Sequence, residues 1–280
     1  MLENEPAHKS SRFLGRILLP VTFVVVWEIS ARGLDLYLFP PASRVFSILL
    51  HPLRSQYAQG SLFTNTLISV VRVSIGFLTA ALVGVSMGLL MGSVRPVRYL
   101  LEPFLELLRP LCPIAWIPFA IAMFKMTSVT DLFGLRYHRG ILSQVQLGML
   151  FVLFWGGFFP ILLNTLDGVA HIRRNYVTLA RTLGSGPWQT YIHVHLPAAM
   201  PMILTGLRQG VGMCWFVLIA AEMLPGTNSG IGYLLIYASD LSAMDLVLTA
   251  MLIIGSIGAL LNSTLLWTTR ALVRWHGKEV

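Results

Sequence analysis

Charged residues are scarce in this sequence. Of its 280 residues, 11% are charged and 55% are hydrophobic, whereas soluble globular domains contain about 25% charged residues. So few polar groups cannot cover a surface that faces water, and the composition therefore excludes a soluble globular protein. It predicts a chain that lies in a lipid bilayer.

Lysine is especially scarce, since only Lys9, Lys125 and Lys278 occur. A nucleotide-binding loop of the form GxxxxGK(S/T) places its lysine between a glycine and a Ser or Thr. None of the three lysines lies in such a run. The sequence therefore excludes this kind of ATP site, and if ATP drives the protein, the nucleotide binds elsewhere.

Residues typical of catalysis and metal binding are also sparse. Cys112 and Cys214 both lie in apolar segments and indicate neither a disulfide framework nor a zinc site. His193 and His195 are two positions apart, which puts them on different faces of a helix. With no nucleophilic triad evident, we expect no catalytic residue, bound cofactor or metal. The net charge of +8 is spread between the apolar segments, which argues against nucleic acid as a partner.

The sequence does contain long apolar segments. A bilayer core of about 30 Å needs roughly 20 apolar residues per helix. Six segments reach or approach that length: about 14–31, 67–91, 103–124, 146–166, 202–222 and 245–268. The sequence thus predicts an all-α integral membrane protein with about six transmembrane helices, in a single domain over residues 1–280.

The distribution of Arg and Lys predicts the orientation of these helices. An even number of spans puts both termini on one side, and the loops and tails on that side hold eleven Arg and Lys residues against six on the other side. Because cytoplasmic loops carry the excess of positive residues, we expect both termini in the cytoplasm. The segment between the fourth and fifth spans then lies in the cytoplasm too.

The second apolar segment contains Gly76, Gly84, Gly88 and Gly92. The last three are four positions apart, so they clear one helix face and let another backbone approach closely. We expect this face to pack within the subunit, with packing between subunits as the alternative.

The third apolar segment contains an interruption that predicts a broken helix. Pro110 and Pro113 follow Arg109 in a run that holds a third proline. The backbone carbonyls that proline frees must be buried in protein or face a water-filled cavity, and transport proteins place substrate paths at such breaks. We therefore expect Arg109, Pro110, Pro113 and Trp116 to line a translocation path. An Arg109–Glu106 ion pair of purely structural value is an equal alternative.

Three further charged residues lie in apolar segments, namely Arg72, Arg208 and Glu222. A charge at membrane depth is costly unless it is paired or serves transport. All three are candidates for the translocation path, where the arginines would offset the desolvation of an anion. Two alternatives stay open: Arg208 extends to the cytoplasmic interface, and Glu222 finds a cation or takes a proton.

The segment Asn175 to Pro201 is polar and basic and lies between two apolar segments. Its pattern predicts a helix over Tyr176–Leu183 that stops at Gly184, because glycine accepts the left-handed conformation of a C-terminal cap. A second helix is expected to begin at Pro187 and to end at Leu196–Pro197.

This segment resembles the cytoplasmic coupling loop of ABC importer permeases, whose pattern is Glu-Ala-Ala, three residues, Gly, nine residues and Ile-x-Leu-Pro. Ala180 and Gly184 fit the pattern, as do Leu196 and Pro197, whereas Thr178 stands where the acid belongs. The resemblance implies a coupling loop over about 167–201 that contacts an ATPase. The residues that it implicates are Tyr176, Thr178, Ala180, Arg181, Thr182, Leu183, Gly184, Leu196 and Pro197.

Three further runs resemble the permease branch that serves nitrate, sulfonate and taurine: Trp116–Pro118, Phe158–Thr165 and Ala220–Met223. The resemblance implies a type I ABC importer permease-like bundle in the inner membrane that acts as a homodimer on a small anionic solute. Its implied partners are two copies of a cytoplasmic ABC ATPase, which bind ATP and Mg²⁺, and a periplasmic or lipid-anchored solute-binding protein. The insertion at about 127–146 departs from the pattern, and either contacts the binding protein or is unstructured.

Two alternative functions stay open. The same machinery could carry a neutral or cationic vitamin-precursor-like solute, since relatives of this branch do so. A secondary transporter of a different class, working without an ATPase, would use Glu222 or Glu106 as its proton-binding carboxylate. The spacing of Gly184 to Pro197 has no explanation in that second case.

Overall fold

The computed structural model describes residues 7–34, 39–55, 60–125, 127–132, 134, 140–172, 174–224 and 226–272. Within these ranges the protein is helical and contains no strand, only two isolated β-bridges. The all-α class predicted from the sequence is confirmed.

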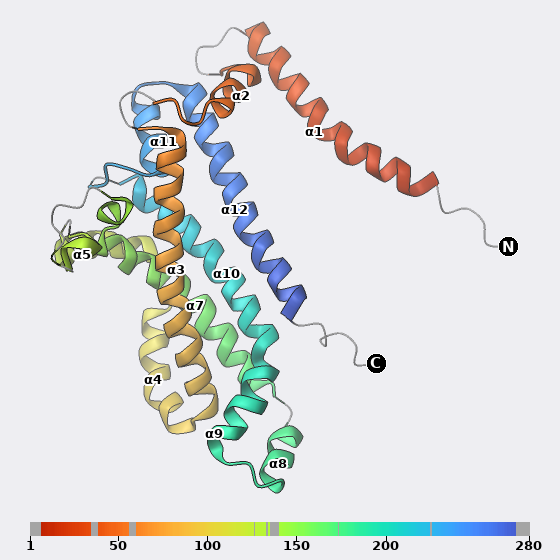
Figure 1. The fold of residues 1–280 in the computed structure, drawn as a ribbon, viewed down its shortest axis with the longest axis vertical. Helices are drawn as coiled ribbons and strands as arrows, with labels where there is room; N and C mark the ends of the chain where they lie inside the picture. The colour runs from red at the N-terminus through yellow and green to blue at the C-terminus, as the bar shows by residue number, and fades with distance from the viewer. Residues whose placement is uncertain are drawn as a thin grey trace.

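The helices follow one another along the chain as an elongated bundle (Figure 1). They are α1 (Ala7–Leu34), α2 (Ala42–Leu50), α3 (Leu62–Ser93), α4 (Arg95–Leu108), the 3₁₀ helix η1 (Pro113–Trp116), α5 (Ile117–Phe124), α6 (Val129–Leu132), the 3₁₀ helix η2 (Ile141–Gln144), α7 (Leu147–Ala170), α8 (Arg174–Thr182), α9 (Pro187–Thr190), the π-helix η3 (Tyr191–His195), α10 (Leu196–Glu222), α11 (Ile231–Asp240) and α12 (Met244–Leu272). The α8 end and the α11 end are the two ends of the bundle.

Four described helices are long and apolar enough to cross a membrane: α3, α7, the continuous helix 188–222 that includes α10, and α12. They correspond to four of the predicted spans. A fifth crossing exists if α4 and the following η1–α5 form one broken span, whose halves are bent by 87°. α1, with 28 residues, is not among the four. The count of six and the cytoplasmic placement of the termini stay predictions.

The third apolar segment, about 103–124, is broken at its prolines as the sequence predicts. α4 begins at Arg95 and ends at Leu108, and the chain then turns through η1 into α5. The reason is the proline pair in the turn, because neither Pro110 nor Pro113 can donate the hydrogen bond that would continue α4.

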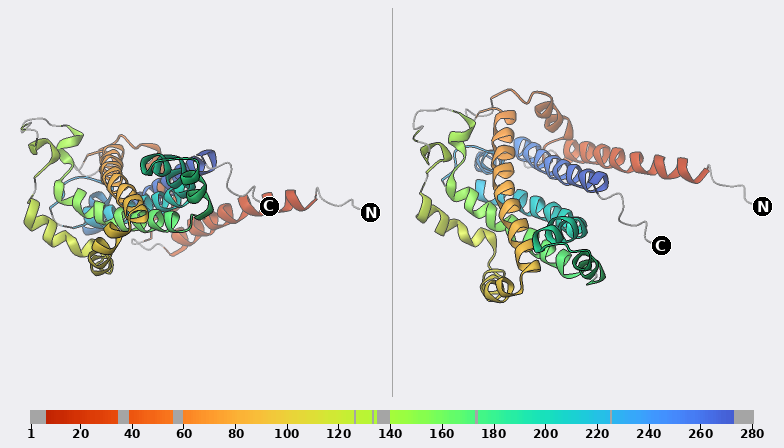
Figure 2. Two further views of the ribbon diagram at one scale, coloured as in Figure 1. Left: turned by 90° about the horizontal axis from the view of Figure 1, so that it is seen from below. Right: turned by 60° about the horizontal axis from the view of Figure 1, so that its bottom comes forward.

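α7 forms the centre of the bundle and packs between α3 and α10 (Figure 2). A Cβ at Gly76, Gly84, Gly88 or Gly92 of α3 would meet the side chain of the α7 residue 77 positions later, at 2.6–3.0 Å. A constant offset means that α3 and α7 run in the same direction. The prediction that this glycine face packs within the subunit is confirmed.

α1 extends away from the bundle and reaches it through α2 (Figures 1 and 2). The indole Nε1 of Trp27 donates to the carbonyl of Pro40 at 3.1 Å, and the carboxylate of Glu28 accepts from the backbone N–H of Ser43 at 3.0 Å. These contacts fix the corner between the two helices.

The insertion at 127–146 is closed at its base by backbone hydrogen bonds. The N–H of Leu147 donates to the carbonyl of Thr127, and the N–H of Val129 to that of Val145, both at 3.0 Å. Short helices α6 and η2 lie inside it, while residues 133 and 135–139 lie outside the described part of the chain.

Candidate translocation and coupling site

α8 ends at the glycine that the sequence singles out. Gly184 has a φ of +81°, in the left-handed region that glycine enters without a steric penalty. The N–H of Ser185 donates to the carbonyl of Ala180 at 3.0 Å, which is the long hydrogen bond of a Schellman C-cap. The helix therefore stops sharply, within a residue or two of the predicted boundaries Tyr176 and Leu183.

One face of α8 is apolar and uncovered. Tyr176, Leu179 and Leu183 are exposed by 47%, 58% and 77% of their surfaces, and their spacing places them along one side of the helix. Thr178 and Thr182 are exposed beside them. Arg181 belongs to α8, but its side chain lies outside the described part. The described chain thus offers nothing that covers this face.

The predicted stop at Leu196–Pro197 is wrong. The chain stays helical from Trp188 to Glu222 through the π-turn η3, and Pro197 lies in the first turn of α10. A π-turn shifts the carbonyls that a proline ring would otherwise meet, so the helix continues past Pro197. The α8 end and the α11 end are therefore joined by one helix.

The apolar face of α8, with Tyr176, Leu179 and Leu183, borders an open hollow of about 800 Å³. Its walls come from the end of α7, from α8, and from η3 with the start of α10. They include Leu179, Ala180, His193, Val194 and Pro197. α8 thus stands away from the bundle on one side while η3 ties it to α10.

The bend after α4 contains four of the residues predicted for the path, namely Arg109, Pro110, Pro113 and Trp116. Arg109 caps α4 and is exposed, and it takes part in none of the ion pairs found among the described residues. The alternative pair of Arg109 with Glu106 is therefore not observed. The acid that pairs nearby is Glu102, with Arg98, at 3.0 Å.

Trp116 at the end of η1 stacks on Trp155 of α7, with ring centroids 5.5 Å apart and an interplanar angle of 8°. Phe119 and Phe151 pack edge-on against Trp116. This aromatic cluster covers the bend on the side of α7, so the bend is a packed and defined structure.

Arg72 and Glu222 form a buried ion pair between α3 and α10. Nη1 of Arg72 lies 2.8 Å from Oε1 of Glu222, and the two side chains are 1% and 0% exposed. The hydroxyl of Ser69 donates to the same carboxylate at 2.8 Å, as does the N–H of Gly232 at 3.0 Å. The expectation that Glu222 finds a cation is thus met within the chain.

The ion pair also holds two loops at the α11 end. Arg72 donates to the carbonyl of Ser229 before α11 and to the carbonyl of Gln144 at the end of η2, both at 2.7 Å. Ser229 in turn donates to Oε1 of Gln144 at 2.7 Å. Four elements thus meet at one guanidinium.

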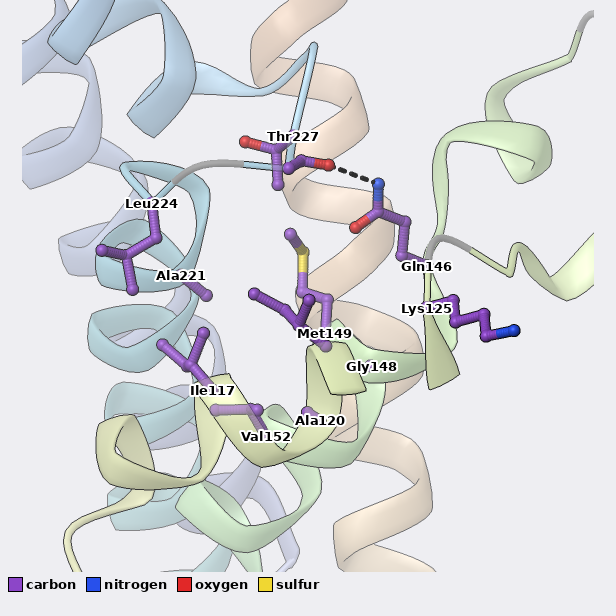
Figure 3. Close-up of a pocket in the computed structure, with 12 residues that line it drawn as sticks. Ile117, Ala120, Lys125, Gln146, Gly148, Met149, Val152, Ala221, Leu224 and Thr227 are labelled. Carbon is purple, nitrogen blue, oxygen red and sulfur yellow. Dashed lines mark hydrogen bonds between the residues drawn. The ribbon is translucent and has the colours of Figure 1, made fainter. Parts of the chain in front are cut away.

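A small cavity of about 40 Å³ lies beside these loops, between α5, α7 and the end of α10 (Figure 3). Its wall is mostly apolar, with Met149 and Val152 on α7. Gln146 closes one side by donating to the carbonyl of Gly226 at 2.9 Å, and Lys125 extends away from it. Its volume suits one or two water molecules.

Arg208 lies near the middle of α10 and is exposed. Its Nε donates to Oδ1 of Asn262 in α12 at 2.8 Å. The neighbouring Gln209 accepts from Nδ2 of Asn164 in α7 at 2.9 Å. No described hydrogen bond or ion pair joins Arg208 or Arg109 to the Arg72–Glu222 pair, so the three arginines occupy separate places.

Comparison with known proteins identifies the family of this chain. The profile of binding-protein-dependent transport system inner membrane components matches residues 61–277. The chain belongs to this family. The matched range includes α8 with the segment that leads to α10, the bend after α4 and the Arg72–Glu222 pair.

Several characterised or named members of the family are similar over most of their length. A protein of Methanocaldococcus jannaschii named as an ABC transporter permease is 41% identical over 248 residues, which is 88% of this chain and 86% of that one. The bicarbonate transport system permease protein of Synechococcus elongatus is 33% identical over 272 residues, 93% and 91% of the two chains. The taurine transport system permease protein of Escherichia coli is 32% identical over 262 residues, 93% and 88%.

Sequence reasoning missed the partners of the charged residues in this family member. It named Arg72, Arg208 and Glu222 one by one, but it did not join Arg72 to Glu222 or Arg208 to Asn262. A weak signal existed, since Ser69 precedes Arg72 by one turn and so marks a polar face on an apolar helix.

Proposed function

We propose that the chain is the membrane-spanning subunit of an ATP-driven ABC importer and forms the translocation path for a small anionic solute of the nitrate, bicarbonate, taurine or sulfonate type. The proposal rests on family membership and on relatives named as permeases for bicarbonate and taurine. A solute-binding protein delivers the solute, and a separate ATPase binds ATP with Mg²⁺.

The observation that carries the coupling role is the uncovered apolar face of α8. Tyr176, Leu179 and Leu183 form a row at the polar end of the molecule, where exposed apolar side chains cost free energy unless a partner buries them. An amphipathic helix of this kind fits a groove on a partner protein. In our proposal each of two ATPase copies receives one α8 from a homodimer of this chain.

The route by which ATPase movement reaches the path is α10. η3 ties α8 to Pro197, and the helix then runs without a break to Glu222. A displacement at the α8 end therefore tilts α10, which packs on η1 at the bend. We propose that this tilt changes which side of the membrane the path faces.

The bend residues Arg109, Pro110, Pro113 and Trp116 are assigned to the path as part of this proposal. The pair Arg72–Glu222 is better suited to hold the α11 end together, since both side chains are buried and matched in charge. Its place in the path stays a prediction.

The first test is whether α8 recruits an ATPase. The tagged chain is purified from its native membrane beside Leu179→Asp, and the proteins that accompany it are identified. An aspartate on the apolar face would oppose burial, so we expect the variant to lose most of the ATPase. Leu142→Asp, at a similarly exposed leucine in the insertion, is the control and should retain it.

The result also separates the proposal from its alternatives. A wild-type chain that carries no ATPase, with solute uptake that collapses together with the proton gradient, would overturn the importer role in favour of a secondary transporter. ATP-dependent uptake of a cationic or neutral solute alone would leave the machinery standing and overturn the anion assignment. The named relatives favour neither alternative.

A further inference from the structure

Three arginines lie in apolar segments, and the structure separates them by their partners. Arg72 is neutralised by Glu222. Arg109 is exposed at the end of α4, with no hydrogen bond from its side chain to the described chain. Arg208 combines an unpaired charge with a neutral polar partner, Asn262 of α12. The next residue, Gln209, is held by Asn164 of α7.

Arg208 is set well inside the membrane-crossing part of α10. At 1.5 Å per residue it lies about 18 Å from Leu196 and about 21 Å from Glu222. If the bilayer core ends at Glu222, its roughly 20 residues reach back to about residue 203, and Arg208 still lies within them. An arginine at this depth needs a partner or a water-filled surrounding.

The side chain of Arg208 does not extend toward the membrane surface. Its Nε donates sideways to Oδ1 of Asn262 in α12 at 2.8 Å. This bond fixes the plane of the guanidinium and leaves both Nη groups without an acceptor in the described chain. The interpretation that Arg208 extends to the cytoplasmic interface is therefore disfavoured.

Neutral hydrogen-bonding groups adjoin Arg208 along α10. Thr205 lies one turn earlier, and Gln209 follows directly; all three residues are exposed. Gln209 accepts from Asn164 of α7 through Oε1 at 2.9 Å, so its Nε2 donors face away and find no acceptor in the described chain. Donors outnumber acceptors here, and no described carboxylate pairs with Arg208.

Unmatched donors beside a single positive charge, on a helix that crosses hydrocarbon, need an anionic acceptor. We propose that Arg208, with the amide of Gln209, binds the oxyanion of the transported solute near the middle of α10. Asn164 donates to the carbonyl of Pro160 and to Oε1 of Gln209, so it holds the Gln209 amide in place and does not bind the solute. Two Nη donors in one plane match two oxygens on one atom, the geometry shared by nitrate, bicarbonate and sulfonate groups. This inference rests on the proposed function and assigns the solute site within it.

The test uses the complete complex with its ATPase and binding protein, reconstituted in proteoliposomes, and measures ATP-dependent uptake of nitrate, bicarbonate and an alkanesulfonate. For the best of these solutes, we expect Arg208→Gln to lower uptake about tenfold or more, the loss typical of a charge-assisted hydrogen bond. Arg208→Lys keeps the positive charge but loses the planar pair of Nη donors. It should therefore show more uptake than Arg208→Gln and a changed ratio among the three solutes.

Gln209→Leu should lower uptake a few-fold, because it removes a neutral donor only. Asn164→Leu should lower uptake by a similar factor or less, because it removes the hydrogen bond that holds Gln209. Arg44→Gln, at an exposed arginine of α2 without an ion pair in the described chain, is the control and should match the wild type. Recovery of the assembled complex is measured for every variant. If Arg208→Gln does not assemble, the test relies on Arg208→Lys and Gln209→Leu. The proposed site is overturned if both variants match the wild type in uptake and in the ratio among the three solutes.

A second arm separates a solute from a lipid headgroup, since both offer an oxyanion. Phospholipid retained by the purified complex is counted by native mass spectrometry, and we expect the same count for the wild type and Arg208→Gln. Loss of a bound phospholipid with unchanged uptake would assign Arg208 to a headgroup and overturn the solute site. Uptake in Arg208→Gln within twofold of an active wild type overturns the site and leaves the importer role intact. Absence of ATP-dependent oxyanion uptake in the wild type overturns both.

Discussion

Arg72 and Glu222 show how a single residue pair can depend on the whole bundle. The need of Glu222 for a cation follows from its apolar surroundings in the sequence. Its partner does not, because the two residues are 150 positions apart and nothing in one sequence relates the rotation of α3 to that of α10. The same limit applies to Arg208 and Asn262.

Removing one charge of this pair should be costly. In Glu222→Gln the guanidinium of Arg72 stays buried without a counter-charge, and loss of one partner of a buried pair typically costs about 3–5 kcal/mol. We expect a marked fall in the free energy of unfolding, measured by denaturant titration of the purified protein in detergent.

Glu102→Gln is the matched control for that measurement. Its partner Arg98 is 43% exposed and Glu102 itself 35%, and exposed pairs contribute about 0–1 kcal/mol. Equal losses in the two variants would contradict the view that burial gives the Arg72–Glu222 pair its weight.

At the scale of helices, the close approach of α3 to α7 depends on missing side chains. An Ala Cβ at Gly88 would lie 2.7 Å from Cβ of Thr165 and 2.9 Å from the carbonyl of Leu162. Overpacking of this kind typically costs about 1–3 kcal/mol. We expect Gly88→Ala to lower the free energy of unfolding by an amount in that range.

Gly255→Ala on α12 supplies the contrast. A Cβ at Gly255 meets nothing within 4 Å, so the substitution should leave stability unchanged or raise it by up to about 1 kcal/mol through helix propensity. An equal fall in the free energy of unfolding for both variants would show that the effect does not arise from the α3–α7 contact.

The helices themselves were predictable where apolar length or glycine decides, as for α3, α7 and the end of α8. At the prolines the outcome is mixed: the predicted break at Pro110 and Pro113 is observed, whereas the predicted stop at Leu196–Pro197 is wrong. Pro110 and Pro113 break a span, whereas Pro197 is taken into a continuous helix by a π-turn. Proline removes one hydrogen bond in every case, and the packing around it, which the sequence does not display, decides between a break and a bulge.

For the whole molecule, orientation in the membrane is the main prediction that awaits a test. We expect α8 in the cytoplasm and η2 outside, because of the excess of positive residues on the side of the termini. In a Cys112→Ala background, Ser143→Cys should react with a membrane-impermeant maleimide in intact cells, whereas Thr178→Cys should react only after the membrane is opened. The reverse pattern would invert the molecule and remove α8 from the compartment that holds ATP.

The constant offset between α3 and α7 limits how this chain can change in length. Deleting one residue from the middle of α7 would rotate everything beyond it by about 100°, because a helix has 3.6 residues per turn. The residues facing Gly84, Gly88 and Gly92 would then all be replaced at once by larger or misplaced neighbours. We therefore expect insertions and deletions to be tolerated in the connecting segments, such as 127–146, and not within the paired helices. Variation in size among homologous chains should then be confined to the loops.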